Sequence, residues 1–301
     1  MGYRIGFDIG STTIKAVVLD ENNQICYKSY ERHKAQVRQK ALDKLVELKK
    51  YTKEPFKFAI SGSGALGLSE QGELPFVQEV FASATGVSKL YPETDCAIEL
   101  GGEDAKILFF QGSVEQRMNS TCAGGTGAFI DQMATLLNMS LEEMNEASLN
   151  YHRLYPIASR CGVFAKTDIQ PLINQGVDKC DLCASIFQAV VDQTITSLAQ
   201  GRKIEGNILF LGGPLYFMSG LRNRFVETLK LSDVQVNCPD TAINFVALGT
   251  AICADQDYTY DELYKVLEDL VHAPAKLTES KPLFESEEDY QKFIERHKSH
   301  D

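Results

Sequence analysis

The chain has 301 residues and a formal net charge of −11, with 44% hydrophobic and 24% charged residues. This composition is typical of a globular protein, and the length suffices for two modest domains with a buried core. The negative charge argues against a general nucleic-acid binder, because phosphate backbones would be repelled. We see no apolar run that would span a bilayer and no signal-peptide core after Met1, so we expect a cytoplasmic protein without a membrane partner.

Strand and helix patterns alternate in the first third of the chain. The expected elements are strands at 3–7, 16–19 and 25–30, a helix at 34–51, a strand at 56–60 and a helix at 78–90. In the first helix, Leu42, Leu45 and Val46 form the apolar face that we expect to pack on the strands.

The second part of the chain repeats this scheme and adds helices. Its expected elements are strands near residues 96, 106 and 113, a helical section at 124–200, a strand at 207–211, a helix at 216–229, a strand at 234–236 and a helix at 243–253. After residue 272 the chain is polar, which is typical of a linker or a short surface helix.

One eight-residue pattern occurs twice, each time between two expected strands. Its copies are Asp8-Ile-Gly-Ser-Thr-Thr-Ile-Lys15 and Glu99-Leu-Gly-Gly-Glu-Asp-Ala-Lys106, which start 99 − 8 = 91 positions apart. Each copy predicts a hairpin with a polar, glycine-containing tip. Such a tip offers backbone N–H groups to phosphate oxygens, and its carboxylate can hold the waters of Mg²⁺. Two matching tips indicate a duplicated domain that closes on a nucleotide.

Two glycine-containing segments nearer the C-terminus give weaker signals. Gly212-Gly213 directly follows an expected buried strand, where backbone can approach a flat ligand such as adenine or its ribose. Alone, this pattern is equally that of an ordinary turn. In Ala247-Leu-Gly-Thr-Ala251, small residues allow one helix to pack closely on another, and we favour this packing role.

Two of the eight cysteines precede expected helices. Cys122 lies in Thr121-Cys-Ala-Gly-Gly-Thr-Gly127, and Cys161 comes just before a helix that begins near Val163. A thiolate at a helix N-terminus is stabilised by the helix dipole and by free N–H groups. Two such thiolates would suit an iron–sulfur cluster, and because a [4Fe–4S] cluster takes four cysteines, two per chain imply two chains. Taken singly, each cysteine is more typical of a buried thiol, and the glycines beside Cys122 also fit a flexible helix lead-in or a third phosphate contact.

Other metal and catalytic patterns are missing from the sequence. Cys180-Asp-Leu-Cys183 is a CxxC without a second CxxC or a histidine pair, so a zinc site lacks ligands. We place these two cysteines in the first turn of a helix. The five histidines are scattered, and the sequence contains no P-loop.

The repeated pattern resembles the phosphate loops of the ATPase superfamily that includes actin, sugar kinases and the Hsp70 chaperones. Residues 8–13 are similar to its first phosphate loop, residues 99–104 to its second, and Leu211-Gly-Gly213 to its adenosine loop. The resemblance implies an α/β fold with two similar actin/hexokinase-like (ribonuclease H-like) domains around a cleft that binds ATP or ADP with Mg²⁺. We divide the chain accordingly into ATPase subdomains at 1–92 and 93–256 and a C-terminal helix with a polar tail at 257–301.

A narrower resemblance, over about residues 3 to 255, is to the activators of 2-hydroxyacyl-CoA dehydratases and the ATPase subunits of benzoyl-CoA reductase. It is carried by Arg117-Met-Asn-Ser-Thr-Cys-Ala-Gly-Gly-Thr-Gly127 and Ile157-Ala-Ser-Arg-Cys-Gly-Val-Phe-Ala165. In that family, the two matching cysteines hold one [4Fe–4S] cluster between two subunits. The resemblance therefore implies a homodimer that shares one cluster through Cys122 and Cys161, an electron donor such as reduced ferredoxin or flavodoxin, and a dehydratase-like or reductase-like acceptor.

The chain departs from the family in its second phosphate loop, where Glu99 replaces the usual Asp and Glu103 the usual Gln. Which acid positions the attacking water is therefore open between Glu99 and Asp104. The segments Pro75-Phe-Val-Gln-Glu79 and 162–170 are also similar to the N-terminal module of long fused activase-like proteins. The sequence is accordingly either a piece of such a protein or a complete short one.

Our leading hypothesis is an ATP-hydrolysing iron–sulfur electron donor of an anaerobic bacterial cytoplasm. Asp8, Glu99 and Asp104 are the expected catalytic acids, and Asp8 is expected to order Mg²⁺ through water. The expected nucleotide contacts are Gly10, Ser11, Thr12, Thr13, Lys15, Gly101, Gly102, Gly125, Thr126, Gly127, Gly212 and Gly213. The alternatives are a small-molecule kinase and a nucleotide-switched regulatory module in which the two cysteines are merely buried.

Overall fold

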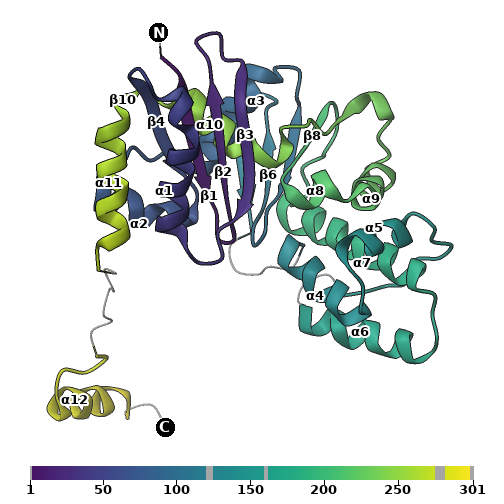
Figure 1. Ribbon diagram of the computed structural model, residues 1–301. Coiled ribbons are helices and arrows are strands. Elements are labelled where there is room, and N and C mark those ends of the chain that lie inside the picture. The colour runs from purple at the N-terminus through teal and green to yellow at the C-terminus, as the bar shows by residue number, and fades with distance from the viewer. Residues whose placement is uncertain (1, 120–124, 159–161, 275–281, 299–301) are drawn as a thin grey trace. The chain divides into compact units, whose positions relative to one another are not determined.

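The computed structural model describes residues 2–119, 125–158, 162–274 and 282–298. These residues belong to two compact units, Met1–Val271 and His272–Asp301. The larger unit contains two five-stranded sheets, with helices between them and on their outer faces (Figure 1).

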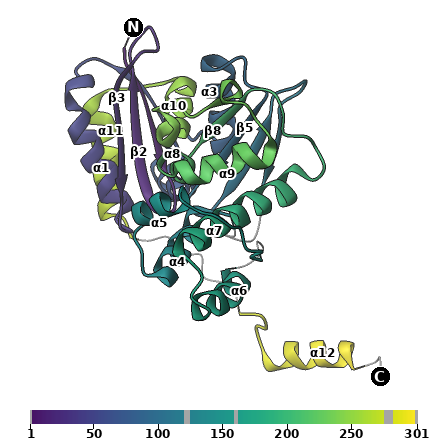
Figure 2. The same cartoon turned by 90° about the vertical axis from the view of Figure 1, so that its right-hand side faces the viewer.

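The first sheet has the strand order β10-β4-β1-β2-β3. Its strands are β1 (Arg4–Ile9), β2 (Thr13–Leu19), β3 (Ile25–Arg32), β4 (Phe56–Ser61) and β10 (Gln256–Tyr258). The first three strands form an antiparallel meander, and β4 runs parallel to β1. The helices α1 (Val37–Glu47), α2 (Leu66–Gly72) and α11 (Tyr260–His272) cover the outer face, where their leucines share a core with the strands (Figure 2).

The second sheet, with the order β7-β6-β5-β8-β9, repeats this scheme. Its strands are β5 (Cys96–Leu100), β6 (Ala105–Phe109), β7 (Glu115–Met118), β8 (Ile208–Leu211) and β9 (Val236–Asn237). Again three strands form a meander, and β8 runs parallel to β5 as β4 does to β1. One face shares a core with the helices α4 (Gly127–Leu137), α5 (Leu141–Ser148), α6 (Gly162–Asn174), α7 (Lys179–Thr194), α8 (Gly213–Phe217) and α9 (Ser219–Leu229).

Two further helices, α3 (Glu79–Leu90) and α10 (Phe245–Cys253), share a third core with strands of both sheets. Glycines bring these elements close together. A Cβ at Gly249 of α10 would lie 2.0 Å from the carbonyl oxygen of Ala82 on α3, and a Cβ at Gly6 of β1 would lie 2.3 Å from that of Ala247. The packing role expected of residues 247–251 is therefore confirmed.

The connection from β8 to α10 differs from the expectation in two places. The expected helix at 216–229 is broken at Met218, whose extended backbone (φ −109°, ψ 91°) separates α8 from α9. The expected strand at 234–236 is a short 3₁₀ turn, Asp233–Gln235, followed by β9. A strand of two residues has too little pattern to be bounded from sequence.

The apolar face of α1 also needs a correction. Val46 is 47% exposed, so its assignment to that face was wrong, whereas Leu42 and Leu45 are buried as expected. Ala41 and Leu48 complete the buried face. Residues 41, 45 and 48 are four and three positions apart, which is the spacing of one side of a helix.

One long apolar helix is α7, which continues as a π-helix over Ile195–Ala199. By length and composition, Lys179–Ala199 passes as a membrane-spanning helix, which corrects the expectation that no apolar run is long enough. However, 67% of its apolar window is buried inside the protein, and Leu182, Ile186 and Val190 belong to the core of the second sheet. The stretch therefore has the burial of a core helix.

The smaller unit contains α12 (Glu287–His297), whose N-cap Ser286 accepts a hydrogen bond from the Asp289 N–H. The Phe284 ring lies 5.2 Å from the ring of Tyr290 and 5.3 Å from that of Phe293. In the segment 257–301, α11 instead shares the core of the first sheet. The division of the chain at 92/93 and 256/257 stays a prediction.

Candidate functional site

The two copies of the repeated pattern form the same hairpin. Asp8 on β1 lies opposite Lys15 on β2, and Glu99 on β5 lies opposite Lys106 on β6. Each tip is closed by one backbone hydrogen bond, from Gly10 to the Thr13 carbonyl (2.9 Å) and from Gly101 to the Asp104 carbonyl (2.8 Å). The sequence repeat is therefore a repeat of geometry.

The match extends to a glycine that follows the neighbouring parallel strand. Gly62 after β4 and Gly212 after β8 have φ values of +99° and +88°, which L side chains rarely adopt. A Cβ at Gly62 would lie 2.2 Å from the Ile9 carbonyl oxygen, and one at Gly212 would lie 2.0 Å from that of Leu100. Only glycine allows the backbone to pass this close behind each hairpin.

The two hairpin tips meet at a cavity of about 410 Å³. A Cβ at Gly102 would lie 3.5 Å from the Thr12 hydroxyl, so the tips are in contact distance of each other. Of the predicted site residues, those that line the cavity are Asp8, Thr12, Thr13, Lys15, Glu99, Gly101, Gly102, Gly127, Gly212 and Gly213. Gly10, Ser11, Asp104, Gly125 and Thr126 are not among the lining residues. The volume is in the range of small-molecule and cofactor sites.

The sequence did not indicate several of the residues that line the cavity. Tyr30 and Arg32 come from β3, and Phe217 comes from α8. The rings of Tyr30 and Phe217 meet edge to face with centroids 6.1 Å apart. No local pattern marks these residues, because the two sheets bring them together from distant parts of the chain.

The first hairpin presents a cation to the cavity. The Lys15 ammonium lies 2.8 Å from a carboxylate oxygen of Asp8, which is 3% exposed. Burial lowers the pKa of Lys15, but Asp8, with smaller contributions from Tyr30 and Glu99, opposes this effect, so the pKa is raised above the usual range. Lys15 therefore stays charged at neutral pH.

The second hairpin instead presents a carboxylate. Burial raises the pKa of Glu99, which is 7% exposed, although the Lys106 ammonium 3.4 Å away opposes this effect. The Ser83 hydroxyl donates a hydrogen bond of 3.1 Å to the other oxygen of Glu99. A partly desolvated carboxylate with a raised pKa is a suitable proton acceptor near neutral pH.

Lys106 is held by three carboxylates. Besides Glu99, its ammonium lies 2.6 Å from Glu79 on α3 and 2.7 Å from Asp104. Burial lowers the pKa of Lys106, but these three anions raise it well above the usual range. Both Glu99 and Asp104 pair with Lys106, but only Glu99 lines the cavity. This difference distinguishes the two acids between which the sequence could not choose.

The cavity has the donor groups that Mg²⁺ prefers but no complete protein cage for it. Carboxylates of Asp8, Glu99 and Glu103 line it, and carboxylate oxygens are typical Mg²⁺ ligands. Across the residues that the structure describes, no group of three or more His, Cys, Asp or Glu side chains is placed to hold a metal ion. This fits a Mg²⁺ that takes most of its ligands from phosphates and water.

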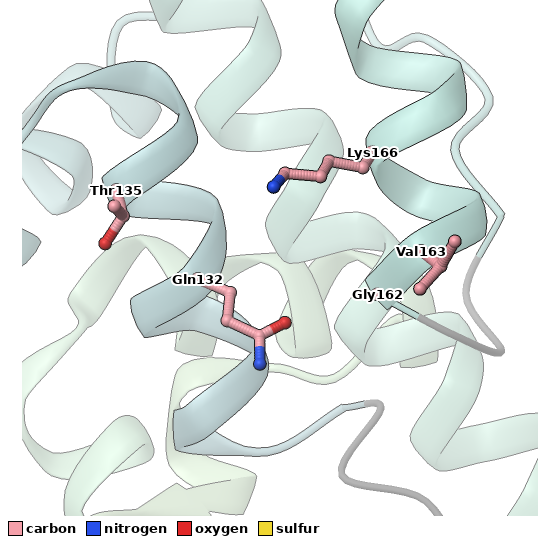
Figure 3. Close-up of a pocket in the computed structure, with 5 residues that line it drawn as sticks. All are labelled: Gln132, Thr135, Gly162, Val163 and Lys166. Carbon is pink, nitrogen blue, oxygen red and sulfur yellow. The ribbon is translucent and has the colours of Figure 1, made fainter.

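Cys122 and Cys161 lie outside the described residues, but the helices that follow them are described. α6 begins at Gly162, where a Cβ would lie 2.9 Å from the Gln132 amide oxygen and 3.8 Å from the ring of Phe129, both on α4. Between the helices is a cavity of about 260 Å³, into which Gln132 and Lys166 extend (Figure 3). The chain thus enters α6 beside α4.

The CxxC cysteines, Cys180 and Cys183, lie on α7. Cys180 lies in the first turn of α7, as expected, whereas Cys183 lies in the second turn, which corrects its expected place; the N-cap of the helix is Asp178. The Cys183 thiol is buried 3.8 Å from the Met139 sulfur, and burial raises its pKa to about 12. A thiol that keeps its proton is a poor metal ligand.

Comparisons with known proteins show the family and the fold of the chain. The family model for the BadF/BadG/BcrA/BcrD ATPase family matches residues 5–254. The (R)-2-hydroxyglutaryl-CoA dehydratase activating ATPase of Acidaminococcus fermentans is 28% identical over 84% of this chain and 96% of its own. The crystal structure of component A of that dehydratase matches with a TM-score of 0.74 and 25% identity, over 89% of this chain and all of its own.

A second solved structure is the activator of the 2-hydroxyisocaproyl-CoA dehydratase from Clostridium difficile, which has ADPNP bound. It matches with a TM-score of 0.73 and 25% identity, over 92% of this chain and 100% of its own. The likenesses confirm the expected α/β fold with two similar actin/hexokinase-like halves and the expected resemblance to dehydratase activators.

Proposed function

Because the chain belongs to the BadF/BadG/BcrA/BcrD ATPase family, we propose that it hydrolyses ATP between its two hairpins and passes a low-potential electron to a partner. The partner is a 2-hydroxyacyl-CoA dehydratase-like or benzoyl-CoA reductase-like protein. The observation that carries the proposal is the pair of matching hairpins, each with an acid opposite a lysine, whose tips meet at one cavity.

The nucleotide is bound mainly by the first hairpin and by the loop after β8. Backbone N–H groups of residues 11–13 and of Gly102 approach the phosphates, whereas those of Gly10 and Gly101 close the two tips. Lys15 neutralises part of the phosphate charge. When Mg²⁺ is bound, Asp8 would hold it through water. Gly212 and Gly213 border the adenosine, because the backbone there has no side chain to fill the cavity. Gly127 lies beside the second tip. We propose that Gly125 and Thr126 do not contact the nucleotide and only connect the preceding chain to α4.

Hydrolysis depends on positioning and on one carboxylate. A water oxygen forms a bond to the γ-phosphorus while the bond to the bridging oxygen breaks, and ADP leaves with the bonding electron pair. One proton of the water passes to Glu99 and then to solvent. Glu99 is preferred over Asp104 for this role because it lines the cavity and carries the raised pKa.

A shared iron–sulfur cluster requires that the chain bring Cys122 and Cys161 to neighbouring helix starts. The described surroundings fit this requirement, because α6 begins beside α4 and the segments with both cysteines lead directly into these helices. The cluster, when bound by two chains, supplies a one-electron carrier of low potential. We propose a cytoplasmic homodimer that receives the electron from reduced ferredoxin or flavodoxin.

The second hairpin connects the nucleotide cavity to these helices. The N–H groups of Gly127 and Ala128, in the first turn of α4, donate to the carbonyl oxygens of Gly101 (3.0 Å) and Gly102 (2.8 Å). A shift of the second tip on ATP binding would therefore move α4, and with it the first turn of α6. Such a link between a binding site and a neighbouring helix is a physical route for coupling.

The proposal is tested by iron and sulfide analysis and an absorption spectrum after anaerobic purification. The wild type is expected to contain about four irons per two chains, and Cys122→Ala to contain none. Cys26→Ala is the matched control, because Cys26 is exposed on β3 and is expected to leave the iron content unchanged. An iron-free wild type, even after reconstitution, would contradict the proposal and favour a regulatory module or a kinase.

A further inference from the structure

The cavity contains a cation that has no role in the proposed function, the guanidinium of Arg32. Arg32 on β3 lies opposite Thr13 on β2 in the antiparallel ladder, and both residues line the cavity. Residues directly opposite each other in such a ladder project to the same face of the sheet. Arg32 is therefore placed beside the tip of the first hairpin.

The charges around the cavity leave Arg32 available for an anion. Five carboxylates line the cavity, on Asp8, Glu99, Glu103, Asp131 and Glu142, and two cations face them, Lys15 and Arg32. Lys15 is paired with Asp8. Arg32 is exposed, and it has no salt bridge or side-chain hydrogen bond with the part of the chain that the structure describes. A triphosphate entering this acidic cavity needs such a cation.

The backbone that carries Arg32 is fixed to the hairpin tip by the next residue. His33 is 3% exposed, and its N–H donates to the Thr12 carbonyl oxygen (3.2 Å). The Ala35 N–H donates to Nδ1 of His33 (3.2 Å), so the ring proton is on Nε2, which donates to the Gly10 carbonyl oxygen (3.0 Å). His33 thus holds both strands of the tip against β3.

The turn after His33 is strained. Lys34 and Ala35 have φ values of +49° and +61°, in the left-handed region that residues other than glycine rarely adopt. This turn keeps the His33 ring in contact with the hairpin. Strain of this kind is found where a site requires an unusual backbone.

The position of Arg32 along β3 indicates which part of the nucleotide it reaches. Tyr30, two residues earlier, has its hydroxyl 3.8 Å from the place of a Cβ on Gly213, and its ring touches Phe217. Tyr30 therefore lies toward the Gly212-Gly213 end of the cavity. Arg32 lies toward the tips of the two hairpins, which is the end for the terminal phosphate.

We infer that Arg32 binds the terminal phosphate of ATP and stabilises the negative charge that develops on the phosphoryl group during hydrolysis, with His33 as its positioning residue. The inference rests on the proposed ATP hydrolysis in this cavity. Arginine suits this role because its planar guanidinium donates two parallel hydrogen bonds to phosphate oxygens.

The test compares ATP hydrolysis, and the binding of a non-hydrolysable ATP analogue and of ADP, in the wild type, Arg32→Gln and Arg32→Lys. In Arg32→Gln, kcat is expected to fall about 10³-fold or more, as for other arginines that stabilise a transferred phosphoryl group. Binding of the ATP analogue weakens about tenfold, and ADP binding changes less than about threefold. Arg32→Lys keeps the charge without the bidentate geometry, so its kcat lies between the two.

Lys53→Gln is the matched control, because it also removes one exposed positive charge and lies outside the cavity lining. If the wild type is active and Arg32→Gln keeps the same kcat and the same affinity for the ATP analogue, the inference is wrong but the proposed function still stands. An equal loss of ATP-analogue and ADP binding would also overturn it, because Arg32 would then not read the terminal phosphate. A wild type that neither binds nor hydrolyses ATP would overturn the proposed function and this inference together.

Discussion

The two hairpins have the same backbone and opposite electrostatics. In the first, the Lys15 side chain is 18% exposed, pairs with one carboxylate and lines the cavity. In the second, the Lys106 side chain is 3% exposed, pairs with three carboxylates and is not among the lining residues, so the charged groups that reach the cavity are the carboxylates of Glu99 and Glu103. The two hairpins therefore share a backbone conformation, and the ion-pair partners of Lys15 and Lys106 determine which charge each hairpin presents to the cavity. The first hairpin is suited to bind phosphates and the second to accept a proton.

The largest expected effect is on the carboxylate of the second hairpin. Glu99→Gln removes the proposed proton acceptor but keeps the shape and the hydrogen-bonding capacity of the side chain. We expect kcat of ATP hydrolysis to fall about 10²–10⁴-fold. Binding of a non-hydrolysable ATP analogue should change little, which steady-state kinetics and titration calorimetry can separate.

Asp104→Asn is the matched control for Glu99→Gln, because it also neutralises one of the carboxylates around Lys106. Since Asp104 does not line the cavity, the kcat of the Asp104→Asn variant should fall by less than about tenfold. A larger loss in Asp104→Asn than in Glu99→Gln would reverse the assignment of the two acids.

The two lysines should differ in what they stabilise. Lys106→Met leaves Glu99 buried beside two other carboxylates without a cation, so the free energy of unfolding should fall by about 3–5 kcal/mol. Lys15→Met removes a partner of one carboxylate that borders the cavity and should cost less. Urea unfolding of both variants measures the difference, and equal losses would mean that the two hairpins are not electrostatically distinct.

The two glycines behind the hairpins, Gly62 and Gly212, should respond alike to substitution. Gly62→Ala and Gly212→Ala each place a methyl group against a carbonyl oxygen at a positive φ, so each should lower the free energy of unfolding by about 1–3 kcal/mol. Gly67→Ala is the control, because a Cβ there meets nothing within 4 Å. A strong loss in only one of the two variants would show that the structural repeat ends at the hairpins.

The smallest expected effect is on the pH profile. Because burial raises the pKa of Glu99, this carboxyl becomes protonated at a higher pH than an ordinary glutamate as the solution is acidified. A protonated carboxyl cannot accept the proton of water. In a pH profile of kcat, the midpoint of the acidic limb should therefore lie at a higher pH than the usual pKa of glutamate, and the limb should disappear in Glu99→Gln. A limb that persists in that variant would have to come from another group.

Sequence patterns predicted what is local. The hairpins, their glycines and most helices follow from apolar periodicity and turn residues within a short stretch of chain, so they could be read in advance. Tyr30, Arg32 and Phe217 could not, because their place in the cavity depends on how β3 and α8 are brought together. The choice between Glu99 and Asp104 was also out of reach, because both acids pair with Lys106 and only the packing of the two sheets decides which of them lines the cavity.

The most direct test of the account is the stoichiometry of nucleotide binding, measured by titration calorimetry of a non-hydrolysable ATP analogue with Mg²⁺. If the two hairpins close on a single nucleotide, one molecule should bind per chain, and Lys15→Met should weaken binding about tenfold or more. Binding of two molecules per chain, or an affinity that does not depend on Lys15, would contradict the claim that the two hairpins form one site.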